Sequence, residues 1–352
     1  MKSYENLFEN VDAIMITSPY NLRYFTSFGG GEGVCILTNG NINLFVDARY
    51  TEVAKAECEG VCVIEFKKGE NLFELIEKTL KENDVQTLGF EAGAVTVAEY
   101  ERYKEELYDI EFKDVGDRLE KTRMIKTDEE LSNIRIAESI GDKAFSEVLP
   151  YIKAGVSEND IAAEIEYKMR KFGGSKTSFE TIAVSGVKSS MPHGRPSNKK
   201  IESGDFLTLD FGCVYNGYCS DMTRTVAVEK VTEEMKKVYD TVLRAQLAGL
   251  DAIKEGVCAS DADAVARKII DDSGYKGRFA HSLGHGVGIR IHELPNLSPK
   301  CDIILEENMV VSCEPGIYIP NLFGVRIEDT VAVKKTGCEN FTHSPKELII
   351  CG

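Results

Sequence analysis

The 352-residue sequence lacks the features that would bring it to a membrane or to a nucleic acid. No apolar run approaches the roughly 20 residues that a membrane span needs. The N-terminal stretch MKSYENLFENVDAIMITSP carries acids and amides where a signal peptide has an apolar core. The net charge is −16, and no basic stripe interrupts it. We therefore expect no nucleic-acid partner and no membrane partner.

Several sequence signatures of enzymes are also missing. HExxH, GxSxG and Walker motifs are absent, which excludes the zincin, serine-hydrolase and NTPase classes that depend on them. The glycine run 29–33 lacks GxGxxG spacing and leads into a predicted strand, so it indicates a turn. The ten cysteines are scattered and form no CxxC pair, which is typical of reduced thiols. We expect a cytoplasmic protein.

The length favours two domains, and 43% hydrophobic residues suit a globular chain. Alternating patterns predict a small α/β domain over residues 1–120, with strands at 11–18, 33–38 and 42–46 and helices at 49–58, 70–83 and 96–107. A charged stretch then leads to a capping box at Thr127–Glu130, which begins a long amphipathic helix. We predict a second domain over 124–352.

A weak internal repeat runs through this second part of the chain. Residues 152–156 (IKAGV) recur as 253–257 (IKEGV), and each run is expected to open a helix. A strand region follows each helical region, and each strand region carries two acids. The acids are Asp210 and Asp221 in the first half and Glu314 and Glu328 in the second.

The stretch DFGCVYNGYCSD, residues 210–221, explains how two acids can meet. Asn216-Gly217 lies between strand-forming residues and predicts a two-residue hairpin turn. Tyr215 then faces Tyr218, and alternation places Asp210 and Asp221 on one face of the sheet. Around 320–324, a loop with an odd number of residues would do the same for Glu314 and Glu328, whereas an even loop or a bulge would separate them. A solvated face on which acids coincide is the alternative.

Four carboxylates at one site would repel one another strongly without cations, so the pattern points to metal. Carboxylate oxygens suit Mn²⁺, and they accept Co²⁺ or Zn²⁺ when an imidazole joins them. The chain has only five histidines. His285 lies in Leu-Gly-His-Gly-Val-Gly, where glycines permit close approach, and we predict it as the fifth ligand. By alternation, Arg326 shares a strand face with Glu328 and is a candidate partner of the acids. We also predict it as a substrate-binding residue.

The motifs MPHGRPSNKKIESGD, LTLDFG, YCSDMTRT, HSLGHGVGIRIHE, SCEPGIYI and GVRIED occur in that order. Together they resemble the prolidase and aminopeptidase P group of the pita-bread metallopeptidases, over nearly all of residues 124–352. SPYNLRYFTSF and VDARY extend the resemblance more loosely to the N-terminal domain. The resemblance implies a creatinase-like α/β domain followed by an α+β pita-bread catalytic domain with an internal pseudo-two-fold repeat.

The resemblance also implies that two divalent ions are bound. Asp221 would be bidentate on one ion and His285 would bind the other, while Asp210 and Glu328 would be shared. Glu314 would shuttle a proton from the bridging water to the leaving amine. His193 and His292 match two histidines on the substrate side, which would bind substrate and the developing oxyanion. His281 and His343 match no catalytic position.

The family resemblance implies hydrolysis of the bond that precedes proline in short peptides. Some prolidases place an arginine after the HExP motif for the substrate carboxylate, but this chain has Asn296 there, and Arg290 could substitute. We therefore expect an Xaa-Pro aminopeptidase, with a dipeptidase as the alternative. A non-catalytic binding module and metal-free creatinase-like hydrolysis are further alternatives that retention of all five ligands disfavours. The family also implies a homodimer.

Overall fold

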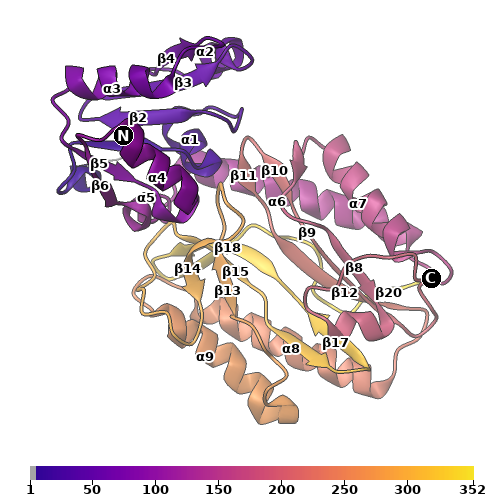
Figure 1. Ribbon diagram of the computed structural model, residues 1–352. Helices are drawn as coiled ribbons and strands as arrows, with labels where there is room; N and C mark the ends of the chain where they lie inside the picture. Colours follow the sequence, from indigo (N-terminus) through magenta and orange to yellow (C-terminus); the bar gives the residue numbers. More distant parts are fainter. Residues whose placement is uncertain (1–4) are drawn as a thin grey trace. The chain divides into compact units, whose positions relative to one another are not determined.

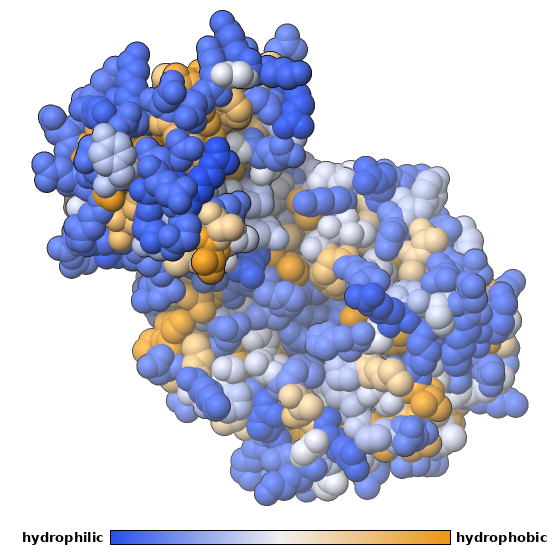
Figure 2. Space-filling model, in the orientation of Figure 1, coloured by the Kyte–Doolittle hydropathy of each residue, from blue (hydrophilic) through white to orange (hydrophobic). Residues whose placement is uncertain are grey.

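The computed structural model describes residues 5–352, and the chain forms two compact units that divide between Thr122 and Arg123. Figure 1 shows the elements of each unit. Hydrophilic side chains dominate the visible face of both units, with apolar ones scattered among them (Figure 2). Within the described residues, no helix combines the length and the apolar character needed to cross a bilayer.

The N-terminal unit is built on a six-stranded mixed sheet with the order β4-β3-β2-β1-β5-β6. Its strands are β1 (Ala13–Ile16), β2 (Val34–Thr38), β3 (Asn41–Asp47), β4 (Cys62–Phe66), β5 (Thr87–Phe90) and β6 (Glu111–Asp114). Its helices are α1 (Pro19–Thr26), α2 (Thr51–Glu57), α3 (Leu72–Glu82), α4 (Val97–Glu106) and α5 (Gly116–Thr122), with short 3₁₀ turns at Glu5–Phe8 and Ala92–Ala94.

Both faces of this sheet are buried, because its strands carry apolar side chains in alternation. On β1, Ile14 and Ile16 belong to one hydrophobic cluster, and Ala13 and Met15 belong to another. This arrangement is expected of a sheet covered by helices on both sides. The predicted strands and helices of this unit are confirmed, and the glycine run at 29–33 lies in a loop that leads into β2.

The second unit contains two similar halves, each with a pair of helices packed on a sheet. The helices are α6 (Asp128–Val148), α7 (Glu158–Lys171), α8 (Glu233–Ala252) and α9 (Ala259–Ile270), with 3₁₀ turns at Leu149–Tyr151 and Gly186–Ser190 and a π turn at Asp271–Tyr275. The capping box predicted for α6 is confirmed: the side chain of Thr127 accepts from the Glu130 amide, and that of Glu130 accepts from the Thr127 amide.

The first half has a four-stranded sheet of order β20-β12-β9-β8 and a small sheet of order β11-β10-β7. The strands are β7 (Lys176–Thr177), β8 (Ile182–Ser185), β9 (Phe206–Phe211), β10 (Cys213–Tyr215), β11 (Tyr218–Cys219), β12 (Met222–Val228) and β20 (Ile350–Cys351). Side chains from α6 and α7, such as Phe145 and Ile165, pack with Leu209 and Phe211 of β9 in one hydrophobic cluster.

The second half has a five-stranded sheet of order β14-β13-β15-β18-β19 and the hairpin β16-β17. The strands are β13 (Gly284–Gly286), β14 (Glu293–Leu297), β15 (Val310–Cys313), β16 (Gly316–Ile319), β17 (Phe323–Arg326), β18 (Asp329–Lys334) and β19 (Gly337–Asn340). The two repeated sequence runs lie at equivalent places, because residues 152–156 precede α7 and residues 253–257 precede α9 at the same spacing.

The two halves meet through their central strands. Thr223 of β12 and Glu328, just before β18, form an isolated antiparallel bridge, and the Glu328 amide donates to the Thr223 carbonyl at 3.1 Å. Nearby, the Thr225 hydroxyl donates to the Arg326 carbonyl at 3.0 Å. We call this line of contact between β12 and residues 326–328 the seam. It places acids from both halves side by side.

Candidate functional site

The first pair of acids lies on the predicted hairpin. Asn216 and Gly217 have φ values of 44° and 84°, as a two-residue turn of this kind requires. Tyr215 pairs with Tyr218, and Asp210 of β9 pairs with Thr223 of β12 in the same register. The prediction of the turn and of its register is therefore confirmed.

The second pair of acids lies on a hairpin of the same parity. Ile319 pairs with Phe323, which leaves three residues in the turn and meets the condition of an odd loop. Cys313 pairs with Asp329 on the other side of the acids. The register, continued from both directions, places Glu314 opposite Glu328, so these two acids face each other directly.

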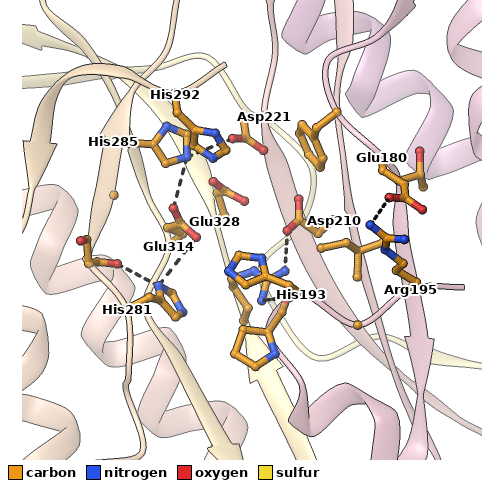
Figure 3. A pocket seen from close by; sticks show the side chains of 18 of the residues that line it. Glu180, His193, Arg195, Asp210, Asp221, His281, His285, His292, Glu314 and Glu328 are labelled. Carbon is orange, nitrogen blue, oxygen red and sulfur yellow. Dashed lines mark hydrogen bonds and ion pairs between the residues drawn. The ribbon is translucent and has the colours of Figure 1, made fainter. Parts of the chain in front are cut away.

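The structure brings all five predicted ligands into one pocket of about 470 Å³ within the second unit (Figure 3). One ligand atom from each of Asp221, His285 and Glu328 lies within 4.8 Å of the others. Nε2 of His285 is 3.4 Å from Oδ2 of Asp221 and 3.4 Å from Oε1 of Glu314. The histidine therefore reaches an acid from each half.

Asp210 lines the same pocket but is directed toward a different partner. Its Oδ2 forms an ion pair with Arg326, while its Oδ1 is buried without a hydrogen-bond partner. Arg326 is 3% exposed and also donates to the Tyr318 hydroxyl at 2.8 Å. The predicted contact between Arg326 and the acids is thus present in the structure. The orphaned oxygen of Asp210 is the kind of buried acceptor that a cation would satisfy.

Burial and mutual repulsion disfavour the ionised forms of the acids in this pocket. Burial, followed by the neighbouring carboxylates, raises the pKa values of Asp221 and Glu328 well above their usual range. Burial raises the pKa of Glu314 to about 8. Burial also lowers the pKa of His285 to about 4, which keeps its imidazole neutral and able to bind a metal. Hard oxygen donors, one neutral imidazole and an unpaired buried oxygen fit divalent cations.

The other histidines of the pocket surround this group. The ring of His292 stands 4.3 Å from the ring of His285, centroid to centroid, and His193 lines the pocket beside Asp210 (Figure 3). His281, for which the sequence indicated no role, also lines the pocket: its Nε2 lies 2.8 Å from the Tyr318 hydroxyl, and its Nδ1 lies 4.0 Å from Glu314. Burial lowers the pKa of His281 to about 3.

Two residues considered in the sequence analysis, Arg290 and His343, are not among the described residues that line the pocket. Burial, followed by the charge of Arg290, nonetheless lowers the pKa of His292, which does line it. Arg195, which the sequence reasoning did not single out, lines the pocket instead and pairs with Glu180 at 3.3 Å.

Sequence reasoning also missed residues that hold the acids in place. The Thr223 hydroxyl donates to Oε2 of Glu328 at 2.6 Å, and the Ser312 hydroxyl donates to Oε1 of Glu314 at 3.2 Å. Thr223 lies two residues after Asp221, and Ser312 two residues before Glu314, so strand alternation was a usable signal for both. Glu138 on α6 accepts from the Asp221 amide at 2.7 Å, and no local pattern marked it.

Comparison with known proteins identifies the two units. Residues 132–335 match the model of metallopeptidase family M24, and residues 8–125 match the creatinase/prolidase N-terminal domain. The chain belongs to metallopeptidase family M24. The expected family and the fold, a creatinase-type α/β domain followed by a pita-bread domain, are thereby confirmed.

Relatives align over almost the whole chain. The Xaa-Pro dipeptidase of Pyrococcus furiosus is 40% identical over 341 residues, which cover 97% of this chain and 96% of that protein. Among solved structures, an Xaa-Pro dipeptidase from Bacillus anthracis has a TM-score of 0.94 at 42% identity and covers 99% of this chain and 96% of its own. An X-Pro aminopeptidase from Thermotoga maritima has a TM-score of 0.92 at 36% identity, covering 99% and 100%.

Proposed function

We propose that this protein is a metal-dependent exopeptidase that hydrolyses the bond between an N-terminal residue and proline. The convergence of four carboxylates and one imidazole from both halves in one pocket carries this proposal. The relatives named as Xaa-Pro peptidases, which align over almost the full chain, support the choice of bond. The residues proposed to hold two divalent ions are Asp210, Asp221, His285, Glu314 and Glu328.

The bound ions would lower the pKa of a water molecule and polarise the substrate carbonyl. Within the protein, Glu314 is the proposed proton carrier, because its carboxyl lines the pocket and lies 3.4 Å from Nε2 of His285, beside the proposed ion site. The Ser312 hydroxyl fixes one oxygen of this carboxyl and leaves the other directed toward His281. The proton would pass from the attacking water to the leaving nitrogen of proline.

His193 and His292 are the proposed substrate-binding groups. Both line the pocket and neither belongs to the proposed ligand set, so their ring N–H groups are available to donate to substrate oxygens. A donor directed at the oxygen where negative charge develops lowers the barrier of acyl transfer. Arg326 would hold Asp210 in place through their ion pair.

A specific observation favours the dipeptidase form of this activity. Among the described residues that line the pocket, the arginines are Arg195 and Arg326, and Arg326 is buried against Asp210. Arg195 is largely exposed, as is its partner Glu180, and an exposed pair of this kind is weak and can be exchanged for a ligand. The free carboxylate of a dipeptide that ends in proline would form an ion pair with Arg195.

The test is a substrate panel assayed with Mn²⁺, Co²⁺ and Zn²⁺ in turn. Cleavage of Ala-Pro but not of Ala-Ala-Ala is the expected result, and equal rates on the two would reject proline specificity. The dipeptidase form predicts slow cleavage of Ala-Pro-Ala, whereas cleavage at the rate of Ala-Pro would favour the aminopeptidase form. Comparison of Ala-Pro with Ala-Pro-amide separates the two forms, because the amide lacks the carboxylate. Arg195→Ala should raise KM for Ala-Pro and leave KM for Ala-Pro-amide unchanged.

Three finer properties complete the proposal. Mn²⁺ is the proposed native metal, because four of the five ligands are carboxylates. The ten free cysteines fit a cytoplasmic location, where thiols stay reduced. A homodimer is the proposed assembly, which light scattering coupled to size-exclusion chromatography would measure directly.

A further inference from the structure

Glu158 is a buried acid that the proposed chemistry does not use. It is the first residue of α7, its exposed fraction is 0%, and it lies outside the metal-ligand group. A buried carboxylate is tolerated only when hydrogen bonds or charges replace the water it loses. The partners of Glu158 show where this carboxylate acts.

Both ends of one loop converge on Glu158. Ser185, the last residue of β8, donates to Oε1 through its amide at 2.8 Å and through its hydroxyl at 3.1 Å. Ser197 donates to Oε2 through its amide at 3.1 Å and through its hydroxyl at 2.9 Å. The eleven residues from Gly186 to Pro196, which we call the His193 loop, lie between these two serines.

A lysine from inside the loop adds a second connection. Nζ of Lys188 forms an ion pair with Glu158 and donates to the Arg195 carbonyl and to the Ser197 hydroxyl, each at 2.8 Å. Glu158 therefore joins the two ends of the loop, and Lys188 links residues within the loop to Glu158. The pocket-lining residues of the loop, which include His193, lie between these linked positions.

The α7 helix strengthens this attachment through its own backbone. The amide of Asn159 donates to the Ser197 carbonyl at 3.0 Å, and the amide of Glu158 donates to the Lys199 carbonyl at 3.1 Å. On the pocket side, Arg326 donates to the Pro192 carbonyl at 3.3 Å. The chain on either side of His193 is thus held by hydrogen bonds from α7 and from Arg326 of β17.

We propose that Glu158 is a positioning residue that sets the place of His193 in the pocket by clamping both ends of the His193 loop. The proposal rests on the role proposed above for His193 as a substrate-binding group. Glu158 does not touch the substrate. It acts through the loop, so its loss should lower turnover only as far as His193 contributes to turnover.

The expected effect of Glu158→Gln is a fall in kcat of up to about 100-fold with metal content unchanged, because a displacement of about 1 Å in a catalytic group has this effect. The amide of the glutamine would present N–H groups to donors that now all point at the carboxylate. Asp160→Asn is the matched control. Asp160 accepts from the amide and hydroxyl of Ser157 in the same first turn of α7, outside the His193 loop, so kcat should not change.

A double-mutant cycle with His193→Ala on Ala-Pro separates positioning from general destabilisation. If Glu158 acts through His193, Glu158→Gln should change kcat by less than about threefold in the His193→Ala background, since coupled residues are not additive. An undiminished loss in that background, or a loss of metal, would overturn the proposal. Ser197→Ala keeps the buried carboxylate and removes one donor, so it should show a smaller effect with the same coupling if Glu158→Gln does not fold.

A measurement without turnover keeps this proposal distinct from the proposed function. The chain has five histidines, so ring signals of histidine-labelled, Zn²⁺-loaded protein can be assigned by substitution. Glu158→Gln should shift or broaden the His193 signals and leave those of His285 in place. Unchanged His193 signals would refute the positioning role even in an active enzyme. Shifted signals in a protein that does not cleave Ala-Pro would support it while the proposed function failed.

Discussion

Removal of divalent ions should make the stability of the second unit fall as pH rises. The pKa of Glu314 is raised from 4.5 to about 8 in the folded chain, so folding favours its protonated form. Its contribution to stability is fully present below about pH 4.5 and is lost as pH rises through about 8. A shift of about 3.5 units corresponds to roughly 5 kcal/mol for this group taken alone. The raised pKa values of Asp221 and Glu328 act in the same direction.

The assay is differential scanning calorimetry of the full chain in EDTA at pH 5.5 and pH 8.5. The transition that responds to added Mn²⁺ belongs to the unit that holds the acids. In EDTA this transition should lie at a lower temperature at pH 8.5 than at pH 5.5. With excess Mn²⁺ the order should reverse, because metal binding requires deprotonated carboxylates and is stronger at high pH.

Glu314→Gln is the decisive variant, because it keeps the shape of the side chain and removes its titration. In EDTA its transition should depend less on pH than that of the wild type, while Glu202→Gln, at an exposed position, should behave as the wild type does. A wild-type transition in EDTA that is equally stable at both pH values would refute the reasoning. An unchanged pH dependence in Glu314→Gln would show that other groups cause it.

Three further outcomes are expected. Asp221→Ala should bind fewer than two ions per chain, measured by elemental analysis, and intact binding with intact activity would remove Asp221 from the ligand set. His193→Ala and His292→Ala should each keep their metal and lose about 100- to 1,000-fold in kcat, and steady-state kinetics beside metal analysis would show whether either loses ions instead. Gly284→Ala should unfold or distort the site, because its Cβ would lie 2.0 Å from the Ser312 carbonyl oxygen, and wild-type melting and metal content would contradict this.

The arrangement of the acids could be predicted because local rules govern it. The turn at Asn216-Gly217 needs positive φ at both residues, which the sequence supplies, and strand alternation then fixes which side chains share a face. The turn after Ile319 contains three residues, and only its parity mattered for Glu314 and Glu328. The first pair was therefore readable from a short stretch of sequence, whereas the second pair depended on a loop parity that the sequence left open and the structure supplies.

The supporting contacts could not be predicted in the same way. Glu138 lies 83 residues from Asp221, and Glu158 lies 39 residues from Ser197. Each sits on a helix, where an acid is usually a solvated residue, and burial is decided by what packs on that helix in three dimensions. Arg195 was missed for the same reason, because its place in the lining of the pocket depends on how the loop that carries it packs in three dimensions.

The seam between the two halves has a consequence for folding. Asp221 comes from one half, and His285 and Glu328 come from the other, so an ion bound to these residues would join the halves as a reversible cross-link. Such a ligand stabilises the folded chain by mass action, by about 4 kcal/mol when free metal exceeds its dissociation constant 1,000-fold. The amount of folded protein in a cell would then follow the supply of free metal, and scarcity of that metal would expose the chain to proteolysis as well as stop its chemistry.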